Sequence, residues 1–67
     1  MPYVVKFMDP VDVVGWLSEP DENGSRSFVE RQDAAIFATL ADAHFAIANS
    51  LHLFAESWIT YDIEPAD

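Results

Sequence analysis

The sequence predicts an α+β domain in which a small three-stranded, mostly antiparallel sheet carries an alanine-rich helix on one face. Two short stretches of β-branched and aromatic residues open the chain, a stretch with helical spacing lies in the middle, and an alternating stretch closes it. Such elements bury their apolar sides best as a helix layer packed on a sheet layer. We expect residues 1–67 to form one compact domain, because so short a chain holds one core.

The first two strands are expected over residues 3–7 and 13–17. In YVVKF the odd-numbered residues share one face at the period-two spacing of a strand. Asp9 and Pro10 break this strand, since a proline disfavours helical geometry in the residue before it. In VVGWL, Gly15 indicates a bulge or a bend. We expect Trp16 to belong to the core.

The middle of the chain predicts a surface loop, a helical turn and a helix. Residues 18–27 hold proline, Asn-Gly and serines, which is typical of a loop, and residues 29–35 could form a helical turn. Thr39 fits the cap of a capping box, with Asp42 reaching back. The helix should continue to residue 54 with this apolar stripe: Leu40, Ala43, Ile47, Leu51 and Phe54. An alternative is one long helix over 29–54, with Thr39 inside it.

The last strand is expected over residues 58–63, WITYDI, with Pro65 ending it. Alternation places three residues toward the core, Ile59, Tyr61 and Ile63, and three outward, Trp58, Thr60 and Asp62.

The charge of the chain limits its possible partners. Twelve carboxylates face three cations, Lys6, Arg26 and Arg31, for a formal net charge of −9. Phosphates would be repelled, so we expect no direct binding to nucleic acid and instead a basic partner. Acid-biased solubility and a salt-rich habitat are alternative explanations. The start resembles no signal peptide and no apolar run approaches the ~20 residues of a membrane span, so we expect a cytoplasmic protein without a membrane partner.

Residues 19–30 raise the alternative of a calcium loop. Five residues fall at the specified positions of the D-x-[DN]-x-[DN]-G-x5-E pattern, with Glu19 standing where the pattern has aspartate: Glu19, Asp21, Asn23, Gly24 and Glu30. Glu19 is one methylene too long for the first position and Pro20 stiffens the second. Arg26 also places a positive charge where an apolar residue is usual. We therefore expect an acidic, solvated loop and no metal.

The sequence contains no constellation that indicates catalysis. His44 and His52 are eight apart, with no histidine or cysteine at the i+4 position of either. The serines lack a G-x-S-x-G motif, and two glycines cannot build a phosphate-binding loop. There is no cysteine, so thiolate zinc sites and disulfides are absent. We expect a protein that is not an enzyme and has no cofactor.

The arrangement of carboxylates predicts an imitation of a phosphate backbone. Asp62 and Glu64 should share one face of the last strand, about 6.6 Å apart at about 3.3 Å per residue, which is comparable with successive phosphates on one DNA strand. A fold could gather the partner-binding candidates along one edge: Asp9, Asp12, Glu19, Asp21, Glu22, Glu30, Asp33, Asp62 and Glu64. Carboxylates on an outward strand face can also serve only to discourage aggregation.

Three stretches, YVVKF, DAAIFATLADAHFAIA and WITYDIEPAD, give the chain a layout that resembles small acidic proteins of bacteriophages and mobile elements, among them many anti-CRISPR proteins. The resemblance rests on size, order and charge over nearly the whole chain. It implies a monomeric inhibitor that covers the basic surface with which a type I CRISPR surveillance complex recognises target DNA or its flanking motif. The rival interpretations are a regulatory interaction module, such as an antitoxin or assembly factor, and the calcium-binding module.

Overall fold

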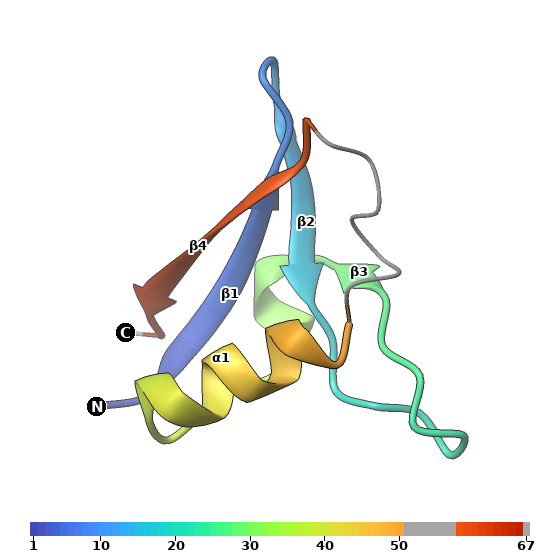
Figure 1. The fold of residues 1–67 in the computed structure, drawn as a ribbon, viewed down its shortest axis with the longest axis vertical. Helices are drawn as coiled ribbons and strands as arrows, with labels where there is room; N and C mark the ends of the chain where they lie inside the picture. The colour runs from blue at the N-terminus through green and yellow to red at the C-terminus, as the bar shows by residue number, and fades with distance from the viewer. Residues whose placement is uncertain (51–57, 67) are drawn as a thin grey trace.

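The structure is a computed structural model that describes residues 1–50 and 58–66 (Figure 1). Its class is α+β, as predicted, with an antiparallel sheet of four strands in the order β3-β2-β1-β4. The expected sheet of three strands was wrong by one strand. Along the chain the elements are β1 (Tyr3–Met8), β2 (Val13–Leu17), β3 (Phe28–Val29), the 3-10 turn η1 (Arg31–Asp33), α1 (Leu40–Ala48) and β4 (Thr60–Pro65).

β1 is the centre of the sheet and pairs along its whole length with β4. The register runs from Tyr3 opposite Pro65 to Met8 opposite Thr60. The ends of the described chain therefore lie together, and the Ala66 N–H donates a hydrogen bond to the Pro2 carbonyl at 2.9 Å (Figure 1). Like β1, β4 is confirmed as a strand, although it lies two residues later than the predicted 58–63 and includes Pro65.

The predicted irregularity in the second strand is confirmed as a β-bulge. Phe7 pairs with Gly15 and Met8 pairs with Val13, so Val14 is the extra residue. A Cβ on Gly15 would lie 2.9 Å from the Phe28 Cβ, so only glycine allows β3 to approach β2 this closely.

β3 was not predicted from the sequence, because a strand of two residues is too short to show an alternating pattern. Phe28 pairs with Leu17, and Val29 pairs with Trp16. The predicted loop over 18–27 connects β2 with β3, and the predicted helical turn is η1.

The alternative of one helix over 29–54 is wrong. Phe37 exchanges two backbone hydrogen bonds with Tyr3, both 2.8 Å, and Thr39 is extended at φ −134° and ψ 162°.

α1 begins where the capping signal predicts. The Thr39 side chain accepts a hydrogen bond from the Asp42 N–H at 3.1 Å. No hydrogen bond among the described residues returns from the Asp42 carboxylate, so only half of the capping box is formed. The helix ends at Ala48 rather than continuing through Asn49 and Ser50, because the Asn49 side-chain amide donates to the Phe45 carbonyl at 3.0 Å and caps the helix there. The rest of the predicted helix, including Leu51, His52 and Phe54, lies outside the described residues.

The core lies between the sheet and α1. It contains Val5, Phe7, Leu17, Ala35, Phe37, Ala43, Ala46 and Ile47. Ala43 and Ile47 are buried, as the predicted apolar stripe of the helix requires. Leu40 was also predicted on the buried side but is 49% exposed, and Ala46 is buried instead. Ile59 and Ile63 pack partly buried against the core, as the alternation predicts. Tyr61 is 41% exposed, although its ring makes an edge contact with Phe7 at 6.5 Å.

Replacing Thr39 with alanine should lower the free energy of unfolding by about 1 kcal/mol, because the Asp42 N–H loses its side-chain acceptor. Thr39→Ser keeps a hydroxyl and should stay close to the wild type. Urea denaturation followed by circular dichroism measures both. Equal losses for the two variants would show that the hydroxyl does not cap α1.

Gly15→Ala should lower the free energy of unfolding by about 1–3 kcal/mol, because the new methyl group overlaps Phe28 across the β2–β3 pair. Gly24 provides the matched control. It has a φ of 81° and no atom within 4 Å of an added Cβ, and asparagine tolerates positive φ. Gly24→Asn should therefore cost much less in the same denaturation experiment, and an equal cost would exclude the steric explanation.

Candidate partner-binding surface

The outer face of the sheet, defined here as the face turned away from α1, carries the two carboxylates of the last strand. The β1–β4 register places Asp62 opposite Lys6, and Glu64 opposite Val4. Trp16 lies on the other side of Lys6, on β2. Asp62 and Glu64 therefore share this face, as the alternation predicts, while their neighbours Ile63 and Tyr61 oppose Val5 and Phe7.

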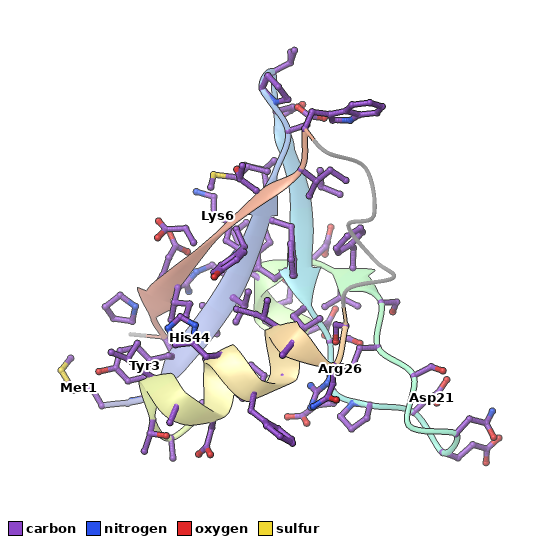
Figure 2. All side chains as sticks on the ribbon, viewed as in Figure 1. Met1, Tyr3, Lys6, Asp21, Arg26 and His44 are labelled. Carbon is purple, nitrogen blue, oxygen red and sulfur yellow. The ribbon has the colours of Figure 1, made fainter. Side chains whose placement is uncertain are left out.

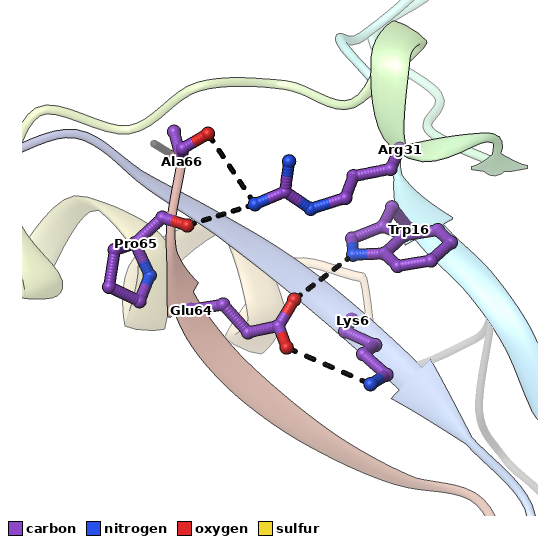
Figure 3. A network of polar contacts seen from close by, with 6 residues as sticks. All are labelled: Lys6, Trp16, Arg31, Glu64, Pro65 and Ala66. Carbon is purple, nitrogen blue, oxygen red and sulfur yellow. Dashed lines mark hydrogen bonds and ion pairs between the residues drawn. The ribbon is translucent and has the colours of Figure 1, made fainter.

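Glu64 is held by two contacts across the outer face (Figure 3). The Trp16 indole N–H donates to its Oε1 at 3.4 Å, and the Lys6 Nζ lies 3.7 Å from its Oε2. The Lys6 and Glu64 side chains are 24% and 30% exposed, so water screens this pair only in part. Trp16 was expected in the core. It is instead half-buried on the outer face, because it pairs with Lys6 and alternates with Leu17, which takes the core side of β2.

Arg31 ties η1 to the end of β4. Its Nη2 donates to the Pro65 carbonyl at 3.0 Å and to the Ala66 carbonyl at 3.4 Å. Figure 3 shows the Arg31 side chain reaching across β1 on the same side as Trp16 and Glu64. The two carboxylates of this segment, Glu30 and Asp33, are exposed and flank Arg31 closely in sequence, so the Arg31 contact brings their segment to the end of β4.

The carboxylates between β1 and β2 form a turn. The Asp9 Oδ1 accepts the N–H groups of Val11 at 2.8 Å and Asp12 at 2.6 Å. The Asp12 Oδ1 accepts the Val13 N–H at 2.8 Å. These bonds take the place of inter-strand backbone hydrogen bonds where the chain reverses between β1 and β2, so both carboxylates have a structural role in the turn.

The carboxylates of the β2–β3 loop divide into structural and unattached ones. Asp21 organises the loop, because its Oδ1 accepts the N–H groups of Asn23 and Ser25 at 2.8 and 2.9 Å. Glu19 and Glu22 are exposed and have no described hydrogen bond through their side chains. Figure 2 shows Asp21 in this projecting loop, well away from Lys6 on the sheet.

The calcium-loop residues are not assembled as ligands. The segment lies between two strands, β2 and β3, whereas a calcium loop of this pattern joins two helices. Asp21 accepts backbone N–H groups, and the Glu30 Oε2 accepts the Gln32 side-chain amide at 3.1 Å. Within residues 1–50 and 58–66, no group of three or more acidic, histidine or cysteine side chains could hold a metal ion.

The nine candidate residues thus form three groups rather than one edge. Asp9 and Asp12 lie at one end of β2, and the loop acids Glu19, Asp21 and Glu22 lie at the other. The seven-residue separation of Asp12 and Glu19 corresponds to about 23 Å of extended chain, in a molecule whose longest extent is 28 Å. The third group, named the outer-face group, is Glu30, Asp33, Asp62 and Glu64.

All three cations of the chain are engaged within the fold. Lys6 pairs with Glu64, and Arg31 donates to carbonyls at the end of β4. Arg26 donates to the Ser18 carbonyl at 2.8 Å and lies over the Phe37 ring at 5.5 Å. Among the ten carboxylates in the described part of the chain, Glu64 alone has a cation within ion-pair distance. The excess of acidic residues can be counted from the sequence. The sequence does not show that Arg26 and Arg31 donate to backbone carbonyls, or that Arg26 lies over an aromatic ring.

The comparisons with known proteins show no relative. No protein-family model, no curated protein and no solved structure matches the chain. The described residues enclose no pocket, and no described helix is long and apolar enough to cross a membrane. His44 is exposed on α1, and His52 lies outside the described residues.

The two carboxylates of β4 should respond differently to truncation. Glu64→Ala should lower the free energy of unfolding by about 1 kcal/mol, because the Trp16 indole and Lys6 both lose their partner. Asp62→Ala, on an exposed site of the same strand, should change it by less than about 0.5 kcal/mol. Chemical denaturation followed by tryptophan fluorescence compares them. Equal values would mean that the Glu64 contacts add nothing to stability.

Proposed function

We propose that this protein is a non-catalytic inhibitor of a nucleic-acid-binding protein complex, and that its acidic surface occupies the basic surface meant for DNA. The supporting observation is the charge balance. Every cation is engaged within the fold, and nine of the ten described carboxylates have no cationic partner. Such a surface repels phosphate and attracts clustered lysine and arginine, which steers the encounter between two proteins.

The outer-face group is the best candidate for the contact. Its carboxylates lie on β4 and in or beside η1. Arg31 fixes η1 to the end of β4, and Glu64 fixes β4 to Lys6 of the central strand β1. A rigid array of anions loses little entropy when it binds, so its charges can replace those of a phosphate backbone at low cost. Asp62, Glu30 and Asp33 supply the free charge, while Glu64 mainly supports the strand that presents them.

The narrower proposal is an anti-CRISPR protein, based on the resemblance in size, order and charge. It would block recognition of target DNA or its flanking motif by a type I surveillance complex. It would act in the cytoplasm of a bacterial host, as a monomer and without a cofactor. The basic DNA-recognition surface of the complex would be its partner, with no direct contact to nucleic acid.

A regulatory interaction module, such as an antitoxin or assembly factor, is the second candidate. The observation that favours it is the exposed apolar surface of α1. Phe45 is 73% exposed on this helix, and mimicry of DNA makes no use of such a side chain. Excess duplex DNA separates the candidates, because it should displace a DNA mimic from its partner but not a module that binds elsewhere.

The order of addition should decide whether a type I surveillance complex loses its target. Protein added before the duplex should abolish duplex binding in a mobility-shift assay, because the basic surface is already covered. Protein added after the duplex should have little effect. Inhibition should weaken as ionic strength rises, because salt screens the attraction. Unchanged duplex binding in both orders would exclude this partner.

Two triple variants of equal charge should separate a specific contact from net charge. The first neutralises the free acids of the outer-face group by Glu30→Gln, Asp33→Asn and Asp62→Asn. The second neutralises three exposed acids elsewhere by Glu19→Gln, Glu22→Gln and Asp42→Asn. The concentration for half-inhibition should rise on the order of tenfold for the first triple, and much less for the second. Equal rises would mean that net charge alone drives binding.

A further inference from the structure

The exposed side of α1 carries an apolar stripe that no core residue of the described chain packs against. α1 buries its other side against the sheet through Ala43, Ala46 and Ile47. Spacings of four and three residues place the stripe opposite these residues, because a helix turns about 100° per residue. The stripe consists of Ala41, Phe45 and Ala48, all exposed.

Phe45 projects from this stripe between two small side chains. It is 73% exposed, and alanine lies one turn before it and one turn after it. The stripe is about 10 Å long at about 1.5 Å per residue. Small residues on both sides of an aromatic ring let another helix approach closely, with the ring in the groove between its ridges.

The charges around the stripe select a basic partner. Asp42 lies in the first turn of α1, and the last turn has no basic residue to balance the partial negative charge of the terminal carbonyls. A second copy of this chain would bring the same acidic helix and its own net charge of −9. Self-association through this stripe is therefore electrostatically opposed, whereas a lysine- or arginine-bearing helix is attracted to both ends of α1.

We infer that the stripe Ala41–Phe45–Ala48 is a docking surface for a basic amphipathic helix of a partner protein. The apolar face of that helix covers Phe45, and its cations lie near Asp42 and the C-terminal carbonyls of α1. This surface is independent of the proposed DNA mimicry, because α1 packs on the core face of the sheet and the β4 carboxylates Asp62 and Glu64 lie on the opposite face. Both surfaces can be occupied together.

Two synthetic peptides test the inference without any assumption about the natural partner. One is a leucine–lysine peptide of about 18 residues whose leucines recur at helical spacing. The other has the same composition, with its leucines distributed around the helix. Calorimetry at physiological ionic strength should show tighter binding of the amphipathic peptide. Phe45→Ala should weaken that binding on the order of tenfold or more, as expected for a buried aromatic anchor.

The control is Val11→Ala, which removes an exposed apolar side chain from the β1–β2 turn and should leave binding unchanged. Circular dichroism should show an intact helix in Phe45→Ala, because alanine is the best helix former. A second variant, Ala41→Gln, places a bulky polar side chain on the stripe without changing the charge and should also weaken binding of the amphipathic peptide.

Equal binding of the two peptides would overturn the inference, because charge alone would then explain the attraction. Unchanged binding by Phe45→Ala and Ala41→Gln would overturn it as well. Sedimentation equilibrium tests the competing occupant. A dimer of the wild type that Phe45→Ala dissolves, together with no preference between the peptides, would assign the stripe to self-association instead. None of these results depends on whether the protein inhibits a DNA-binding complex.

Discussion

The antiparallel pairing of β1 with β4 is the contact on which the rest of the structure depends. It is the longest pairing in the sheet, with six residue pairs, and it joins residues near the two ends of the chain. It places Ile63 beside Val5 on the core face and, one residue later, Glu64 beside Val4 on the outer face. A slip of one residue would exchange the two faces and bury carboxylates under α1. The register thus determines both the core and the acidic surface.

The three cations show how a strongly acidic chain can still hold a precise fold. Arg31 and Arg26 donate to backbone carbonyls, and Lys6 pairs with a carboxylate that also accepts the Trp16 indole. The Arg31 and Lys6 contacts join segments that are distant in sequence, whereas the Arg26 contact with Ser18 closes the β2–β3 loop. The cations therefore act as cross-links between segments, and the remaining acid stays on the surface, where water solvates it.

Much of the fold could be predicted from local patterns, whereas the candidate site could not. β1, β2 and the start of α1 follow from alternation, from Gly15 and from Thr39, which are signals contained within a few residues. β3 has two residues, and it is held by its pairing with β2 and by the contact of Phe28 with Phe7, whose ring centroids lie 5.1 Å apart. The site candidates separate into three groups because β2 holds its two flanking turns apart. The contrast between Asp62 and Glu64 depends on Trp16, which is 48 residues away from Glu64.

The position of β4 in the sheet has a consequence for biosynthesis. While the ribosome is making the chain, β1 and β2 can already form a hairpin, but Val5 and Phe7 have no neighbour on their other side until residues 60–65 emerge. The nascent chain must therefore keep an apolar strand edge open from the emergence of β1 until residues 60–65 emerge. Such edges pair readily with other chains. The abundant carboxylates, which repel neighbouring nascent copies, protect this intermediate before the last strand closes the sheet.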